Sequence, residues 1–317
     1  MKAAAIALTR RIIWAIGTVL VVSLAIFVLV QVGGGEIARM LAGEGATDDA
    51  IREIERHLGL DRPLLVRYFE WVQHAAAGDL GASLLTNEPI SAIIARGLPV
   101  TLSLILVALT FSVVVGLAAG LIAASRAGSL LDRAISAVAS AGVAVPSFVI
   151  ALVFVRELAV ERPIFPAIGY TSFAESPASW LQHLALPALA LSGITVGEIT
   201  RHLRSSAVGV LAMDYILTAH AKGLSQWAII TKHTLRNAAL PVITILGIRF
   251  SQMLGSTVIV EHIFVMRGAG SSLVSATQSG DVTVVLAVTV VATALVVGAN
   301  LVVDLSYVAL NPKLRKG

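Results

Sequence analysis

Runs of apolar residues, each about as long as a lipid bilayer is thick, recur along this chain and limit what it can fold into. Hydrophobic residues make up 57% of the sequence and charged residues 13%, whereas soluble domains carry about 25% charged residues. A helix that crosses the hydrocarbon core needs about 20 apolar residues. The sequence therefore predicts an all-α, polytopic membrane protein.

Six windows have this length, although two of them contain interruptions. The fourth includes Pro187 and Glu198, and the fifth includes Arg249. Arg10 and Arg11 precede the first window, as in a signal peptide, but its apolar run exceeds the roughly 7 to 15 residues of a signal-peptide core and no cleavage site follows. We therefore expect an uncleaved first span. The predicted spans are 11–32, 99–124, 134–155, 181–200, 239–260 and 281–309.

Basic residues gather on one side of the predicted membrane. Thirteen of the 23 Lys and Arg residues fall in the N-terminus, the loop 125–133, the stretch 201–238 and the tail 311–317, with only Asp132 and Asp214 as acids. The segments on the other side together hold more acids than bases. Because short basic loops stay in the cytoplasm, we expect both termini to be cytoplasmic.

A polar stretch, residues 214–241, lies in the predicted cytoplasmic connection between the fourth and fifth spans. Residues 213–222 favour a helix, Gly223 suits the position after its end, and Ser225 suits the N-cap of a second helix. The stretch thus predicts a helix, a tight turn and a helix, which either rests on lipid headgroups or binds a partner. Residues at helical spacing in the second helix are Trp227, Ile230, Thr231, Thr234 and Leu235.

Residues across this stretch carry a family resemblance: Asp214, Tyr215, Thr218, Ala219, Ala221, Lys222, Gly223, Leu224, Ser225, His233, Leu235, Arg236, Asn237, Leu240 and Pro241. They resemble the cytoplasmic EAA loop of inner-membrane permease subunits from bacterial ABC importers, in the dipeptide, oligopeptide and nickel group. The general pattern has Glu-Ala-Ala, three residues and Gly. This chain has Leu217-Thr218-Ala219 before Gly223.

The resemblance extends over about the whole chain, with two departures. The family usually has Phe-x-x-Pro-Gly-Leu-Gly at the position of residues 264–270, which lack the proline in this chain. The second departure is a short outer loop near 156–166, which shortens the third span. The other matching landmarks are Gly78–Gly81 with Ser83, Arg96–Pro99 with Thr101 and Leu102, Gly128 and Ser129, Leu131–Arg133, Val145–Phe148, Leu186–Ala188, Asn300–Asp304, Asn311 and Pro312.

The resemblance implies a domain organisation and a set of partners. Residues 1–98 would form a first span and an extracytoplasmic scaffold, 99–310 a permease core of five helices with the coupling loop 201–238, and 311–317 a cytoplasmic tail. The partners would be a second homologous permease subunit, two cytoplasmic ATPases and an extracytoplasmic solute-binding protein, in the bacterial inner membrane. The residues expected to couple to the ATPase are Asp214, Tyr215, Thr218, Ala219, Ala221, Lys222, Gly223 and Leu224.

The residues themselves favour a non-catalytic subunit, with no cofactor, metal or nucleic acid bound. The chain has no Gly-x-x-x-x-Gly-Lys-Ser/Thr phosphate loop, and Gly33-Gly34-Gly35 lacks the lysine. Two rival classes are an ion-coupled secondary transporter, which would use buried ionisable residues, and an intramembrane hydrolase. The seven histidines show no His-Glu-x-x-His spacing, and no serine lies in Gly-x-Ser-x-Gly.

Glu198 and Arg249 are candidates for the translocation path, because a bare charge at bilayer depth costs about 2.5 to 3.5 kcal/mol. They lie on the two spans that flank the coupling loop. The alternatives are a structural ion pair, Glu198 with Arg201 or Arg249, and a site that meets the charged termini of a peptide.

A helix is also predicted outside the membrane, from Asp48 to His57, with Thr47 as its N-cap. The transported solute is not specified by the sequence. In the resembling group a separate binding protein mainly selects among dipeptides, longer peptides, nickel chelates and related solutes.

Overall fold

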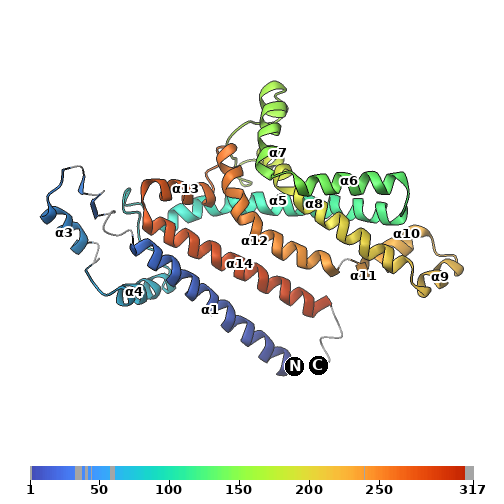
Figure 1. Ribbon diagram of the computed structural model, residues 1–317, viewed down its shortest axis with the longest axis horizontal. Coiled ribbons are helices and arrows are strands. Elements are labelled where there is room, and N and C mark those ends of the chain that lie inside the picture. The colour runs from blue at the N-terminus through green and yellow to red at the C-terminus, as the bar shows by residue number, and fades with distance from the viewer. Residues whose placement is uncertain are drawn as a thin grey trace. The chain divides into compact units, whose positions relative to one another are not determined.

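Helices dominate the computed structural model (Figure 1), which describes residues 2–32, 38–39, 42–43, 45–57, 61–238 and 240–310. Within this part of the chain, five helices are long and apolar enough to cross a membrane. They match five of the predicted spans and confirm an all-helical, polytopic protein; the tail 311–317 lies outside the described residues. These helices are α1 (Lys2–Val32), α5 (Ile90–Ser125), α8 (Pro177–Leu211), α12 (Leu240–Ile263) and α14 (Val282–Leu310).

The third predicted span, 134–155, is not one continuous helix. The chain forms α6 (Leu130–Ala144) and then α7 (Ser147–Phe154), which continues into the π-helical η1 (Val155–Glu161), with a bend of 98° between the two parts. The bend falls where Val145 adopts an extended conformation, with φ −89° and ψ 122°, just before Pro146. A residue before proline is disfavoured in the helical region, so the proline overrides the apolar composition that predicted a single helix.

The described chain divides into two compact units, and the first contains residues 1–98 and 272–298. Its helix α3 (Asp48–His57) has the predicted bounds, and the amide of Ala50 donates to Thr47 Oγ1 at 3.4 Å, as expected for the N-cap. Helix α4 (Leu64–Ala76) packs against α1. The core of this unit forms around Phe27, Tyr68 and Leu286.

The second unit contains residues 99–271 and 299–317, and α8 is its most buried long helix. Of the apolar window of α8, 61% is buried, against 11 to 28% for the other four candidate spans. Glycines allow α6 to approach α8 closely: a Cβ on Gly142 would lie 3.0 Å from the carbonyl oxygen of Gly193. The two helices therefore pack backbone against backbone.

The predicted helical hairpin connects α8 to α12. It consists of α9 (Asp214–Ala221), α10 (Gln226–Ala228), the π-helical η2 (Ile229–Thr234) and α11 (Leu235–Ala238). A further helix, α13 (Ala269–Ser279), follows α12.

The close packing of α6 on α8 gives a test with a control on the same helix. A Cβ on Gly197 would overlap the carbonyl oxygen of Ala139 and lie 2.7 Å from Val143 Cγ2, whereas a Cβ on Gly209 would meet nothing within 4 Å. We expect Gly197→Ala to destabilise the protein by about 1 to 3 kcal/mol through overpacking. Gly209→Ala should be neutral or stabilising by up to about 1 kcal/mol, because alanine favours helix more than glycine does.

The measurement is the thermal midpoint of the purified complex in detergent. Equal midpoints for Gly197→Ala and the unsubstituted protein would contradict the close contact.

Candidate functional site

The hairpin between α8 and α12 turns at Gly223, as the sequence predicts. Gly223 has a φ of +75°, its amide donates to the His220 carbonyl at 2.9 Å, and the Leu224 amide donates to the Ala219 carbonyl at 3.2 Å. These two bonds form a Schellman motif, which ends a helix at a left-handed residue. Ser225 then begins the next helix by accepting from the Ala228 amide at 3.3 Å, so the predicted N-cap is also confirmed.

The inner face of the hairpin includes Thr234 but not Trp227, although both belong to the set at helical spacing in the sequence. Ile229 and Thr234 are fully buried, while Trp227 is 75% exposed. The cause is the π-helical η2, in which Thr234 Oγ1 donates to the Ile229 carbonyl at 3.1 Å. A π-helical turn shifts the register by about one residue relative to an α-helix, and this shift exchanges the side chains that face inward.

Burial separates the eight predicted coupling residues into two groups. Ala219 is 6% exposed and packs with Ile216 and Ile229, so its side chain holds the hairpin together. The other seven are exposed. Large apolar side chains are exposed on the same element, namely Met213 at 49%, Tyr215 at 41%, Leu217 at 64%, Leu224 at 41% and Trp227 at 75%. We call these five residues the apolar surface of the hairpin.

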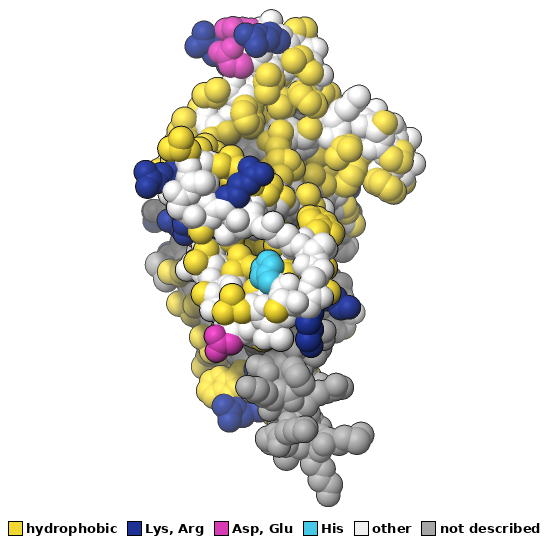
Figure 2. Space-filling model, turned by 90° about the vertical axis from the view of Figure 1, so that its right-hand side faces the viewer, with side chains coloured by type: hydrophobic (Ala, Val, Ile, Leu, Met, Phe, Trp, Pro, Cys, Tyr) yellow, Lys and Arg dark blue, Asp and Glu magenta, His cyan; other side chains and the backbone are white. Residues whose placement is uncertain are grey.

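Figure 2 views the end of the molecule that lies at the right of Figure 1, where α9 and α10 are labelled. Hydrophobic side chains on this face are interspersed with separate Lys and Arg side chains. The hairpin is anchored beneath: Asn237 Nδ2 donates to the Tyr215 hydroxyl at 3.1 Å, and Ala238 joins Leu203 and Ala207 of α8 in one buried cluster. The exposed surface is therefore attached firmly to the end of α8.

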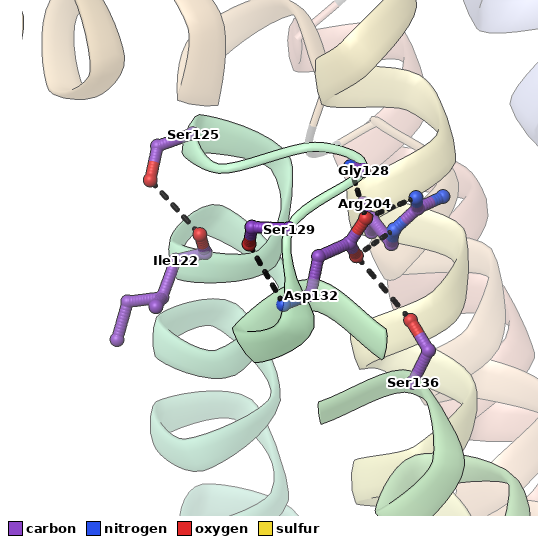
Figure 3. Close-up of polar contacts among 7 residues, drawn as sticks. All are labelled: Ile122, Ser125, Gly128, Ser129, Asp132, Ser136 and Arg204. Atoms are coloured by element: carbon purple, nitrogen blue, oxygen red, sulfur yellow. Dashed lines mark hydrogen bonds and ion pairs between the residues drawn. The ribbon is translucent and has the colours of Figure 1, made fainter. Parts of the chain in front are cut away.

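An ion pair also fastens α8 to the start of α6 (Figure 3). The Asp132 side chain is 2% exposed. One of its carboxylate oxygens accepts a hydrogen bond from Arg204 Nη2 at 2.6 Å, and the other accepts one from Arg204 Nε. The Gly128 amide donates to the same carboxylate at 2.8 Å, and Ser129 caps α6 by accepting from the Asp132 amide at 3.2 Å. Asp132 lies in a predicted loop and among the family landmarks, but the sequence does not predict its partner, which is 72 residues away.

Glu198 and Arg249, the two candidates for the translocation path, are paired. Arg249 Nε donates to Glu198 Oε2 at 2.6 Å, Arg249 Nη2 binds the other carboxylate oxygen, and Arg249 Nη1 donates to Gln252 at 2.7 Å. The side chains are 16% exposed for Arg249 and 23% for Glu198. The structure thus pairs Glu198 with Arg249 rather than with Arg201, and leaves both partly accessible.

Glu261 is a buried carboxylate that lies directly after the fifth predicted span, which ends at residue 260. It is fully buried, accepts from Thr101 Oγ1 at 2.5 Å, and accepts from the Ser271 amide at 2.8 Å. These bonds join α12 to α5 and to the first turn of α13. The sequence offers one signal for this site. An acid stands at the end of an apolar window, and a glycine-rich segment, residues 268–270, follows it closely.

Comparison with known proteins decides the family. Residues 116–316 match the family model described as "Binding-protein-dependent transport system inner membrane component", and residues 6–105 match the model for its N-terminal region. The chain belongs to this family. It is an inner-membrane permease subunit of an ABC importer, which confirms the resemblance, the location and the non-catalytic class predicted from the sequence.

Two curated relatives align over 306 residues, or 96% of this permease. The "Probable peptide ABC transporter permease protein y4tP" of Sinorhizobium fredii is 36% identical, with 98% of its length covered. The glutathione transport system permease protein GsiC of Escherichia coli strain K12 is 34% identical, with 97% covered. A solved structure, an inward-facing form of the MetNI methionine ABC transporter, shares the fold at 19% identity, with a TM-score of 0.57 over 69% of this chain and 96% of that one.

The Asp132–Arg204 pair gives a prediction about the support of the hairpin. We expect Arg204→Gln to destabilise the permease by about 2 kcal/mol, below the roughly 3 to 5 kcal/mol of a fully buried pair, because a third of the Arg204 side chain is exposed and water can partly replace it. Arg201→Gln, an exposed arginine one turn earlier on α8, is the matched control and should change stability by less than about 0.5 kcal/mol. Thermal midpoints of the purified complex give the measurement, and equal losses in the two variants would argue against the pair's structural role.

Proposed function

We propose that this permease is one of two homologous subunits that form the path of an importer for peptides or similar small solutes. Two cytoplasmic ATPases would supply the energy and an extracytoplasmic binding protein would deliver the solute. The family description names a binding-protein-dependent system, and the relatives are named for peptide and glutathione transport. Those names support a solute with a peptide backbone.

The proposed topology has six crossings, with the bent pair α6 and α7 counted as one, and with both termini in the cytoplasm. Thirteen basic residues on the side of the hairpin support this orientation. The hairpin would then face the ATPases, and the segment 33–98 would lie on the side of the binding protein.

The exposed apolar surface of the hairpin is the observation that carries the coupling proposal. In a water-exposed cytoplasmic loop, five large apolar side chains on one short element cost free energy unless a partner covers them. A short helical element inserted into a groove of another protein is a common mode of recognition. Since the hairpin is fixed to α8, movement of an ATPase bound to it would move α8 as well.

The turn at Gly223 provides a test of coupling. A β-branched residue at a φ of +75° is strained by about 1 to 2 kcal/mol, whereas asparagine tolerates this conformation. We expect Gly223→Val to leave the complex assembled, to lower solute uptake in vesicles about tenfold or more, and to abolish the stimulation of ATP hydrolysis by loaded binding protein. Gly223→Asn should retain most of both activities. Normal uptake by Gly223→Val would count strongly against this assignment of the hairpin.

We further propose that Glu198 and Arg249 line the translocation path. The face of α12 next to Arg249 exposes Thr244, Gln252 and Ser256 together with the apolar Ile248, at intervals of four residues. Polar and ionisable groups at membrane depth generally face a bundle interior or a water-filled cavity rather than lipid. This face therefore suits the space between two permease subunits, where the pair could exchange its internal bonds for the ammonium and carboxylate ends of a peptide.

An ion-coupled transporter would also use buried ionisable groups, and that alternative shares the Glu198–Arg249 pair. Membership of a binding-protein-dependent ABC family favours an external energy source instead. The two mechanisms differ in whether uptake needs ATP hydrolysis by the partner subunits.

Single and double substitutions separate a role in the path from a purely structural pair. We expect Glu198→Gln and Arg249→Gln each to lower uptake about tenfold while complex levels stay within about twofold, because both side chains retain access to water that can solvate the remaining charge. The double substitution should not restore uptake. A double variant that regains both uptake and complex would show that the pair is only structural. The Glu88–Arg96 pair, whose side chains are 35% and 64% exposed, serves as control, since exposed pairs contribute about 0 to 1 kcal/mol.

A further inference from the structure

Helix α4 exposes apolar side chains on the face opposite to the one it packs against its own unit. Its inner face, formed by Leu64, Tyr68, Trp71 and Val72, joins the core cluster of the first unit. Its outer face exposes Leu65 at 59%, Val66 at 43% and Phe69 at 62%. A helix in water is expected to be polar on its outer face, so this second apolar face requires an explanation.

The neighbouring helix α3 has the opposite character, although it belongs to the same segment of the sequence. Its outer positions are exposed charges that pair along the helix, Arg52 with Asp49 at 3.9 Å and Arg56 with Glu53 at 3.1 Å. This is the pattern of a helix that faces water. The contrast shows that the apolar outer face of α4 is a property of that helix and not of the whole segment.

Contacts with α1 locate α4 along the membrane normal. The Tyr68 hydroxyl donates to the Leu20 carbonyl at 2.9 Å and lies 2.8 Å from Ser23 Oγ, and its ring packs on Phe27 with 5.5 Å between centroids. Helix α1 ends at Val32. At a rise of about 1.5 Å per residue, the Leu20 carbonyl is about 18 Å inside that end and Phe27 is about 8 Å inside it.

Contacts with α14 give the same depth independently. The core cluster that contains Tyr68 also includes Leu286 and Val290 of α14, whose apolar span begins at Val282. These two residues lie about 6 and 12 Å inside that beginning. Two membrane-crossing helices therefore place α4 beside the apolar part of the bilayer and not beyond it.

From this depth and this outer face we propose that α4 is a membrane-embedded helix whose Leu65, Val66 and Phe69 contact lipid acyl chains. The lipid surface of α1 continues onto it, since α1 exposes Val21 at 68% and Leu29 at 73% over the same depth. In the proposed orientation this is the outer leaflet, which amphipathic helices enter by about 5 to 10 Å.

The Arg62–Glu70 pair fits this placement, and the Arg67 guanidinium lies over the Phe27 ring, 5.9 Å from its centroid. Arg62, just before the helix, donates to Glu70 from Nη1 at 2.9 Å and from its second terminal nitrogen, so the two residues carry no net charge together. Both side chains are long and keep 44 to 48% exposure, which lets them extend toward the headgroups.

Spin labels test the proposal in the assembled complex, because the chain has no cysteine of its own. Nitroxides on single cysteines at Leu65 and Phe69 would be compared with one at Val21 on α1, as the lipid reference, and one at Arg52 on α3, as the water reference. The complex is reconstituted in phosphatidylethanolamine and phosphatidylglycerol vesicles, and relaxation by oxygen is measured against relaxation by a water-soluble nickel chelate. All four side chains are exposed, so each substitution should preserve assembly, which size-exclusion chromatography checks.

We expect oxygen to relax the labels at Leu65 and Phe69 more strongly than the nickel chelate, by about threefold or more, as at Val21, and the reverse at Arg52. Preference for the nickel chelate at both α4 positions would place the helix in water and overturn the proposal. Protection from both reagents would also overturn it, by indicating that a partner subunit or the binding protein covers α4 instead of lipid.

Discussion

Two ion pairs between an arginine and a carboxylate hold the second unit together, and one helix, α8, takes part in both. Its Glu198 binds Arg249 of α12, and its Arg204 binds the buried Asp132 of α6. Each arginine uses two nitrogens on two carboxylate oxygens, a geometry that restricts orientation as well as distance. The rotation of α6 and α12 about their own axes is therefore restrained against α8, which apolar contacts alone would restrain less.

Small residues supply the second restraint on the same helix. Lipid tails are as apolar as leucine, so helices in a membrane gain little from hydrophobic burial and associate through close packing and polar contacts. Gly142 of α6 meets Gly193 of α8, and the Gly197 position leaves no room for a side chain against Ala139. The ion pair at the start of α6 and the glycine contacts along it together make α6 and α8 a single packed element.

Local rules made part of this structure predictable from the sequence. The left-handed turn at Gly223, the caps at Ser225 and Thr47, and five of the spans each depend on residues close together in the chain. The possibility of a Glu198–Arg249 pair was also accessible, because consecutive elements tend to be neighbours in space. The bend at Pro146 was signalled locally too, but a window of apolar composition does not register a missing amide.

Other features depend on information that a periodic pattern does not contain. The π-helical turn buries Ile229 and leaves Trp227 exposed, which a helical wheel does not predict because it assumes one constant pitch. Asp132 and Glu261 find their partners in distant parts of the chain, so a linear reading could assign them only to a loop and to the end of a span. The proposed depth of α4 likewise rests on contacts with α1 and α14. The local sequence of α4 is compatible with this depth but does not predict it.

The course of α8 connects the proposed coupling surface to the proposed path with no proline between them. From Glu198 to its end at Leu211 the helix runs about 20 Å, and Arg204 lies between them. The proline within α8, Pro187, lies on the far side of Glu198 from the hairpin, and proline is where helices most often kink. A displacement at the hairpin would therefore reach the Glu198–Arg249 pair along a proline-free part of α8, which the Arg204–Asp132 pair also holds against α6. Any flexing of α8 at Pro187 would occur only beyond that pair, so the two ends of the helix can respond differently to the same movement.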